Sequence, residues 1–120
     1  MNLNQIGLPT TDIAASSTFY RKLGFVPVVD TPEYARFKRQ EGPATFSLLK
    51  APGSIASGVT LYFEVSNVEE VVRRLQGQGI TFTEEPKRQS WGWTEARLKD
   101  PSGNSLCIFL AGQSRLNPNN

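Results

Sequence analysis

Residues 59–80 have the sequence VTLYFEVSNVEEVVRRLQGQGI, and this stretch predicts a strand followed by a helix. Its opening residues are mostly β-branched or aromatic, which is typical of a strand. Ser66 and Glu69 have the spacing of a capping box, so a helix is expected to begin there. Valines and a leucine then recur at helical spacing until Gly77 and Gly79, which are expected to end the helix.

A strand and a helix of the same kind are predicted near the start of the chain. Residues 2–8 alternate enough between apolar and polar types to favour a strand, and the following helix is expected to run to about Leu23. Gly24 ends it, because glycine commonly follows the last helical residue. The side-chain oxygens that can cap its first turn belong to Thr10, Thr11 and Asp12.

The two strand–helix units match at a constant offset. Asp12 lies 55 residues before Asn67, and Gly24 lies 55 residues before Gly79. Because a polar residue near the start of the helix and a terminating glycine keep the same separation, we predict that one strand–helix–strand unit is used twice.

The repeat extends into the hairpins that follow each helix. Residues 35–38, ARFK, recur as residues 96–99, ARLK, and Gly42 recurs as Gly103, each 61 residues later. The strand expected after each turn covers residues 45–49 in the first copy and 105–110 in the second. Each module is therefore predicted to be β-α-β-β-β, although short alternating strands also resemble one another by chance.

One domain of the α+β class is expected. A chain of 120 residues that is 38% hydrophobic is long enough for a single ordinary core. A stretch rich in glycine and serine separates the copies, and an Asn- and Pro-containing tail without regular structure is expected at the end. The expected boundaries are module one over about residues 1–50, a linker over 51–58, module two over about 59–111 and a tail over 112–120.

The composition excludes several classes of function. A net charge of +2 is too small for the electrostatic footprint of a nucleic-acid-binding protein. No apolar run approaches the roughly 20 residues that a membrane helix needs, and the first residues lack the pattern of a signal sequence. The single cysteine, Cys107, cannot form an internal disulfide, so a cytoplasmic location is expected.

The chain contains no histidine. Histidine is the commonest general acid or base and a frequent ligand of zinc, iron and copper. A catalytic site of the Ser-His-Asp or Cys-His type is therefore excluded, and the sequence identifies no catalytic residue.

Several short motifs together resemble the vicinal oxygen chelate superfamily, also called the glyoxalase/bleomycin resistance protein/dioxygenase family. The likeness runs from about residue 3 to 111 and is greatest to the bleomycin-resistance-like branch. The motifs that carry it are Gln5-Ile6-Gly7-Leu8, Ser17-Thr18-Phe19-Tyr20, Leu23-Gly24-Phe25, Tyr62-Phe63-Glu64-Val65, Trp91-Gly92-Trp93 and Asp100-Pro101-Ser102-Gly103-Asn104.

The resemblance implies two βαβββ modules whose eight strands form a U-shaped open sheet with a ligand cleft, usually in a homodimer. In metal-bearing members the ligands lie on the first and last strands of each module. The equivalent positions here hold Gln5 and Thr60 on the first strands, and Phe46 and Cys107 four residues after each turn glycine.

None of these four residues is a carboxylate or an imidazole, the donors that divalent ions prefer. We therefore expect no metal ion and no other cofactor. Gln5 is a weak ligand by itself, as a glutamine is in some glyoxalase I proteins, and a weak site that combines it with Glu64 or Glu95 stays open.

Strand alternation predicts which residues face the cleft. Within residues 59–65 the apolar Leu61 and Phe63 belong against the helix, which turns the intervening residues to the opposite face. The same alternation in the other strands puts aromatic side chains and a few charged groups on this face. Such a surface is typical of a ligand pocket, although it is also found in dimer interfaces. The predicted ligand-binding residues are Gln5, Tyr34, Arg36, Phe46, Thr60, Tyr62, Glu64, Trp91, Trp93, Glu95, Arg97, Cys107 and Phe109.

Three classes of function remain open. The favoured one is a metal-independent protein, similar to antibiotic-resistance proteins, that binds and sequesters a small molecule such as a drug or metabolite. The second is an enzyme, either a metal-dependent lyase or dioxygenase or a metal-free isomerase with Glu64 or Glu95 as its base. The third is a dimeric scaffold without a ligand.

The charges predict the kind of ligand. Arg36 and Arg97 are equivalent in the two modules and favour an anionic aromatic molecule, unless Glu64 and Glu95 pair with them. Bleomycin binders of the family are acidic and match a cationic drug. This chain has a net charge of +2, so bleomycin itself is not expected to be its ligand.

Overall fold

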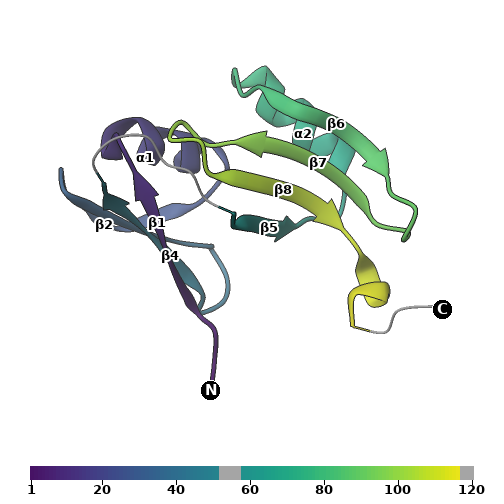
Figure 1. Cartoon of the computed structure of the whole chain (residues 1–120), viewed down its shortest axis with the longest axis horizontal. Helices are drawn as coiled ribbons and strands as arrows, with labels where there is room; N and C mark the ends of the chain where they lie inside the picture. The colour runs from purple at the N-terminus through teal and green to yellow at the C-terminus, as the bar shows by residue number, and fades with distance from the viewer. Residues whose placement is uncertain (52–57, 117–120) are drawn as a thin grey trace. The chain divides into compact units, whose positions relative to one another are not determined.

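The computed structural model describes residues 1–51 and 58–116, and it contains two four-stranded sheets, each packed against one helix (Figure 1). The contacts divide the chain into two compact units. The first comprises Met1–Ser57 and Asp100–Asn104, and the second comprises Gly58–Lys99 and Ser105–Asn120. The predicted α+β class is confirmed, and each module has its own core.

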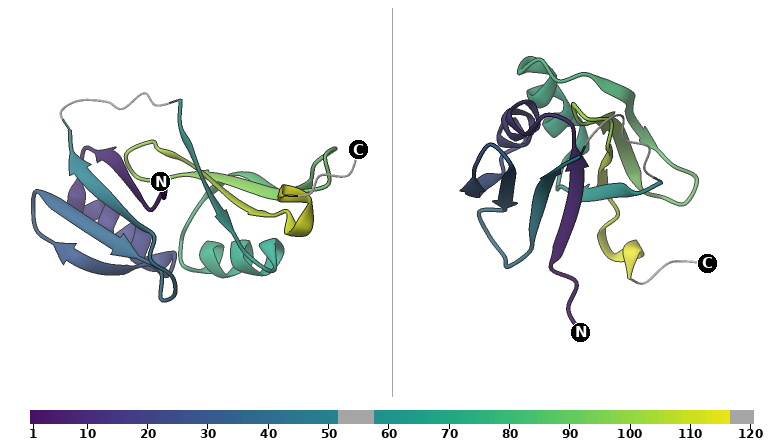
Figure 2. Two further views of the ribbon diagram at one scale, coloured as in Figure 1. Left: turned by 90° about the horizontal axis from the view of Figure 1, so that it is seen from below. Right: turned by 60° about the vertical axis from the view of Figure 1, so that its left-hand side comes forward.

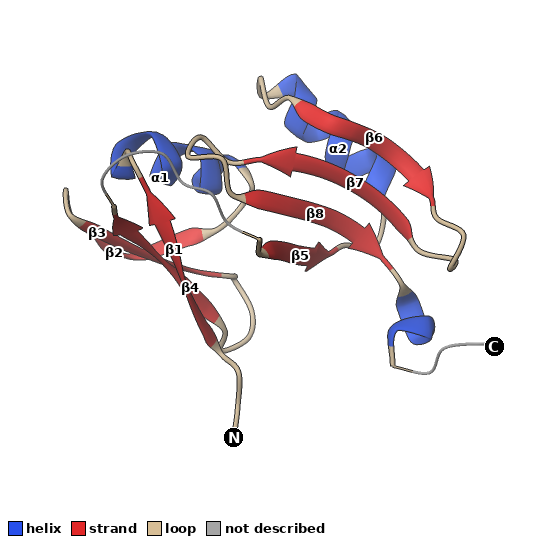
Figure 3. Cartoon of the chain, in the orientation of Figure 1, coloured by secondary structure: helices blue, strands red, loops and turns tan. Residues whose placement is uncertain are grey.

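The first unit has the strand order β1-β4-β3-β2 (Figure 3). β1 runs parallel to β4, whereas the other neighbours are antiparallel. α1 packs against β3 and β4 on one face of this sheet (Figure 2). The elements are β1 (Gln5–Thr10), α1 (Ile13–Lys22), β2 (Val26–Asp30), β3 (Tyr34–Lys38) and β4 (Thr45–Lys50).

The second unit repeats this topology with the order β5-β8-β7-β6, and its parallel pair is β5 with β8. α2 packs against β6, β7 and β8. The predicted internal repeat is therefore present strand for strand. The elements are β5 (Thr60–Glu64), α2 (Val68–Gly77), β6 (Phe82–Arg88), β7 (Thr94–Lys99), β8 (Ser105–Leu110) and the 3-10 helix η1 (Gly112–Arg115).

Both helices begin at equivalent caps. Asp12 accepts a hydrogen bond from the backbone of Ala15 at 3.0 Å, and Asn67 accepts one from Glu70 at 3.0 Å. The two cap residues have nearly the same extended backbone, with φ of −144° and −149°. The capping box expected at Ser66 is therefore wrong by one residue, because the side-chain Oδ1 of Asn67 accepts from a free N–H group of the first turn.

Both helices also end in the same way. Gly24 and Gly79 have φ of 103° and 87°, in the left-handed region that glycine adopts without strain. The next residue in each copy donates its N–H back to a carbonyl of the last turn, from Phe25 to Tyr20 and from Ile80 to Leu75, at 3.1 Å in each case.

Aromatic rings fill the core of the first unit. The fully buried rings of Tyr20 and Phe37 lie 6.2 Å apart between α1 and the sheet. In the second unit the core is aliphatic, and its helix contributes Val68, Val72 and Leu75 at helical spacing.

The turn between β7 and β8 belongs to the first unit, although the sequence placed it in module two. The buried Asp100 carboxylate accepts hydrogen bonds from the Tyr20 hydroxyl at 2.7 Å and from two nitrogens of Asn104 at 2.8 and 2.9 Å. Asn104 also donates to the carbonyl of Pro9 at 2.9 Å. A buried carboxylate needs such donors, and the first unit supplies one of them from its own helix.

Two segments differ from the predictions, the first strand and the C-terminal tail. The first strand begins at Gln5 and continues to Thr10, whose buried hydroxyl bonds with Ser16 at 2.8 Å. The expected unstructured tail is wrong over residues 112–115, which form η1. Residues 52–57 of the expected linker and 117–120 of the tail lie outside the described residues. Within the described part of the chain, no helix is long and apolar enough to cross a membrane.

Candidate functional site

One face of the second sheet carries most of the residues predicted to bind a ligand. Alternation along β5, β7 and β8 puts these side chains on the face opposite α2. The two rows that the strand register aligns across this face are Tyr62, Cys107 and Arg97, and Glu64, Phe109 and Glu95.

The aromatic side chains of this face form a cluster. The Trp93 ring stacks on Phe109 with centroids 5.0 Å apart and an interplanar angle of 23°. Tyr62 meets the same Phe109 ring edge-on at 5.5 Å and is 48% exposed. Trp91 is 57% exposed and makes no ring contact within the described residues, so the structure does not bring it into this cluster.

Arg97 is neutralised on this face. Its Nη2 donates to the buried carboxylate of Glu95 at 3.0 Å and to the Tyr62 hydroxyl at 3.3 Å, and its Nε lies 3.6 Å from Glu84. The bond to Tyr62 and then that to Glu95 raise the pKa of Arg97 further above its ordinary range. Glu84 was not predicted as a site residue, because the pairing of β6 is irregular around it and strand alternation does not reveal its partner.

Cys107 is fully buried on this face, and Thr60 lies at one end of it. Burial, and secondarily the Glu95 carboxylate, raise the pKa of the Cys107 thiol to about 12. A thiol of this kind is protonated at neutral pH and is a poor nucleophile. Thr60 lies opposite Ser105 at the start of β5, and its side chain makes no hydrogen bond within the described residues.

Glu64 is engaged by the C-terminal segment. One carboxylate oxygen accepts the backbone N–H groups of Ala111 and Gly112 at 2.9 and 3.1 Å, and the other lies 3.7 Å from the Nε of Arg115. Glu64 thus caps η1 and compensates free N–H groups at its start.

The first sheet has a polar counterpart to this face. The Gln5 amide donates to the Ser47 hydroxyl and accepts a hydrogen bond from Thr45. Ser47 bonds in turn with the Tyr34 hydroxyl at 2.6 Å, to which the Nε of Arg36 donates at 2.9 Å. The hydrogen bonds from Ser47 and then from Arg36 lower the pKa of Tyr34.

Phe46 does not share this face, and its prediction as a cleft residue is wrong. Its ring stacks on Phe37 at 5.5 Å and meets Tyr20 at 4.9 Å, in the core beneath α1. Only 7% of the residue is exposed.

Turn length explains this error. The turn over residues 39–44 is one residue longer than its equivalent over residues 100–104. Counting four residues from the turn glycine therefore gives the correct face for Cys107 but the wrong one for Phe46, because neighbouring strand residues point to opposite faces. Ser47 is the true equivalent of Cys107, since each pairs with the arginine of the preceding strand.

Comparison with known proteins identifies the family. The family model of the Glyoxalase/Bleomycin resistance protein/Dioxygenase superfamily matches residues 2–108. The chain belongs to this superfamily. The predicted resemblance is thereby confirmed.

Relatives of this superfamily member include proteins linked to bleomycin. A bleomycin resistance protein from Klebsiella pneumoniae is 29% identical, over 89% of this chain and 94% of that protein. The structure of a bleomycin-binding protein complexed with bleomycin has a TM-score of 0.75 and 25% identity, over 92% of this chain and 99% of that one. A bleomycin resistance determinant encoded on transposon Tn5 has a TM-score of 0.78 and 25% identity, over 93% and 99%.

Other solved structures show the shared fold. Lactoylglutathione lyase from Agrobacterium tumefaciens has a TM-score of 0.76 at 21% identity, covering 92% of this chain and 93% of that one. At this identity the likeness concerns the fold alone.

The residues at the superfamily's metal positions do not fit a divalent ion in this chain. With Ser47 in place of Phe46, the set offers an amide, two hydroxyls and a buried thiol. The Gln5 amide is bonded through both its nitrogen and its oxygen. Across residues 1–51 and 58–116 there is no group of three or more His, Cys, Asp or Glu side chains that could hold a metal. Hard divalent ions prefer carboxylates, which this set lacks.

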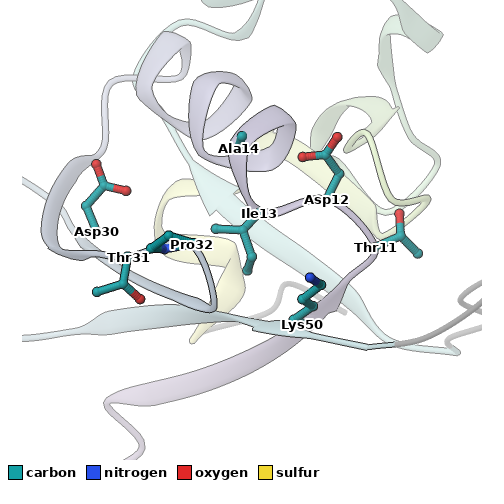
Figure 4. Close-up of a pocket in the computed structure, with 8 residues that line it drawn as sticks. All are labelled: Thr11, Asp12, Ile13, Ala14, Asp30, Thr31, Pro32 and Lys50. Atoms are coloured by element: carbon teal, nitrogen blue, oxygen red, sulfur yellow. The ribbon is translucent and has the colours of Figure 1, made fainter.

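The first unit also has an open pocket of about 560 Å³ (Figure 4). Its charged groups already have partners. Asp30 pairs with Arg21, and the Lys50 ammonium lies 3.8 Å from Glu33. None of the predicted binding residues is among its lining residues, which are Thr11, Asp12, Ile13, Ala14, Asp30, Thr31, Pro32 and Lys50.

Proposed function

We propose that this superfamily member binds a small organic molecule without a metal ion and sequesters it. The observation that carries the proposal is the aromatic cluster of the second sheet, in which Trp93 stacks on Phe109 beside the half-exposed ring of Tyr62. A planar ligand on these rings excludes water from both surfaces. Each well-placed aromatic pair contributes about 0.5–1.5 kcal/mol beyond the area it buries.

The relatives support a binding role. One is a bleomycin resistance protein, and another was solved as a bleomycin-binding protein complexed with bleomycin. We propose that the ligand here is anionic, unlike the cationic bleomycin, because this chain has a net charge of +2.

The enzyme alternative has less support. Glu64 caps η1 through two backbone N–H groups, and Glu95 is buried beside Arg97. A general base must be free to reach a substrate proton, and both carboxylates are engaged within the fold. The thiol of Cys107 is buried and protonated at neutral pH, which disfavours nucleophilic catalysis.

Two further proposals concern the state of the protein. A homodimer is favoured because each sheet has two edge strands, β1 and β2 in one and β5 and β6 in the other. A cytoplasmic location rests on the single, unpaired Cys107, which is buried.

Tryptophan fluorescence tests the binding proposal. The Trp91→Phe variant leaves Trp93 as the single tryptophan, so that its emission reports on the cluster. We expect a set of planar aromatic compounds, with bleomycin included, to contain members that quench this emission saturably. Trp93→Phe should retain their binding in calorimetry, since it keeps an aromatic ring, whereas Trp93→Leu should weaken it. Undiminished binding to Trp93→Leu would show that the cluster is not the site.

A further inference from the structure

The repeat places one arginine at the same position in each sheet, but the two arginines differ in their partners. Arg97 lies 3.0 Å from Glu95 and 3.6 Å from Glu84. Arg36 uses its Nε for the Tyr34 hydroxyl at 2.9 Å and lies over that ring at 5.4 Å. In the described part of the chain it forms no ion pair.

The hydrogen bonds around Arg36 leave donors in excess. Arg36 and Gln5 each donate one N–H into the pair of hydroxyls formed by Tyr34 and Ser47. The two hydroxyls share one hydrogen between them, so one O–H remains without an acceptor whichever way their bond points. The Nη groups of Arg36 and the second amide hydrogen of Gln5 are also uncommitted in the hydrogen bonds of the described residues.

Among the described residues, no acidic side chain forms an ion pair with Arg36. The Gln5 oxygen already accepts from Thr45, and Ser47, which is 1% exposed, is held inside the network. The next residue on the same face of β3 is the exposed Lys38, which adds positive potential. The cluster therefore lacks an anion, whereas its counterpart around Arg97 contains two.

We propose that Arg36, Tyr34, Ser47 and Gln5 form a carboxylate subsite on the first sheet. The inference goes beyond the proposed function, because it assigns a chemical class of ligand to the first unit taken by itself. The two Nη groups of a guanidinium are spaced to donate in parallel to two carboxylate oxygens. Tyr34 fixes the other edge of the guanidinium through Nε, so that the Nη edge is held ready for the ligand.

The test uses two probes of nearly the same shape, one anionic and one neutral. 2-Naphthoate and its neutral isostere 2-naphthamide are titrated into the full chain, with binding measured by calorimetry and by NMR of the arginine Nε–Hε signals. We expect the carboxylate to bind more tightly than the amide, on the order of tenfold to hundredfold. The Arg36 signal should move with naphthoate and much less with naphthamide.

Three variants test whether the preference for the carboxylate probe comes from Arg36. Arg36→Gln should abolish the preference for the carboxylate, whereas Arg36→Lys should retain a reduced preference, since it keeps the charge but loses the fork. Arg73→Gln removes the same charge from an exposed position on α2 and serves as the control, in which the preference should be unchanged. The NMR spectrum of each variant shows whether it remains folded.

The outcomes separate this inference from the proposed function. Equal affinity for the two probes, or a preference that survives in Arg36→Gln, would overturn the carboxylate subsite while leaving a binding protein. Binding of neither probe at millimolar concentration would count against both proposals. Loss of the preference in the Arg73→Gln control would show that overall charge, and not the Arg36 cluster, attracts the carboxylate.

Discussion

The Tyr20 hydroxyl donates a 2.7 Å hydrogen bond to the Asp100 carboxylate, although 80 residues separate the two in the sequence. Both residues are buried, with exposed fractions of 0% and 4%. This hydrogen bond connects the turn between the last two strands to the first helix of the chain.

Removing this hydroxyl should destabilise the protein. In Tyr20→Phe the ring still fills the core, but Asp100 loses a charge-assisted hydrogen bond in a buried place. We expect the free energy of unfolding to fall by about 1–3 kcal/mol. Urea unfolding measures it, with Tyr62→Phe as the matched control on a half-exposed ring. Equal stability of Tyr20→Phe and wild type would mean that water replaces the hydroxyl without cost.

The same bond predicts a dependence on alkaline pH. Burial first, and then the Asp100 charge, raise the pKa of Tyr20 above its ordinary value of 10.0. The folded protein thus keeps the hydroxyl protonated where the unfolded chain ionises it, so the stabilisation is complete below pH 10.0 and declines as the pH rises further. Urea unfolding between pH 8 and 11 should show that the difference in free energy of unfolding between wild type and Tyr20→Phe becomes smaller above pH 10. A difference that stays constant or increases above pH 10 contradicts this prediction.

The repeat in the sequence predicted much of this fold correctly. The 55-residue offset matched Asp12 with Asn67, and these two residues are the N-caps of α1 and α2 in the structure. The local capping-box pattern had indicated Ser66 instead. Equivalent positions in a repeat share one backbone geometry. A match between the two copies is therefore better evidence for the position of a helix cap than a local pattern that several neighbouring polar residues can satisfy.

The site was harder to predict, because a single residue of turn length decides which face a strand presents. Phe46 was expected beside Arg36, but the longer first turn puts Ser47 there. The partner of Arg97 on β6, Glu84, could not be found either, since the pairing of that strand is irregular on both sides of it. The expected U-shaped cleft stays a prediction.

Cys107 should resist thiol reagents in the folded protein. With a pKa of about 12, its thiolate fraction at pH 8 is on the order of 10⁻⁴, and the residue is fully buried. We expect Ellman's reagent to react with none of the thiol in the native state and with one thiol per chain in urea. Rapid reaction in buffer would mean that the strand pair around Cys107 opens readily.

The chain should form a homodimer. Each unit leaves two strand edges unpaired, and such edges are commonly covered in native assemblies. Light scattering at micromolar concentrations is expected to give about twice the chain mass of 13.3 kDa. A mass of one chain that does not change with concentration contradicts this prediction.

The protein should carry no stoichiometric transition metal. The positions at which the resemblance to the superfamily implies metal ligands hold Gln5, Ser47, Thr60 and Cys107. The described residues contain no cluster of acidic, histidine or cysteine side chains that fits an ion. Such donors lack the anionic oxygen and imidazole groups that bind divalent ions tightly. We expect elemental analysis of gently purified protein to find well below one metal per chain, and dialysis against EDTA to leave the melting temperature and ligand affinity unchanged.

One tightly held metal per chain, lost in Gln5→Ala, would contradict the prediction and favour the enzyme alternative. Gln113→Ala, an exposed glutamine in η1, is the control and should leave any bound metal in place.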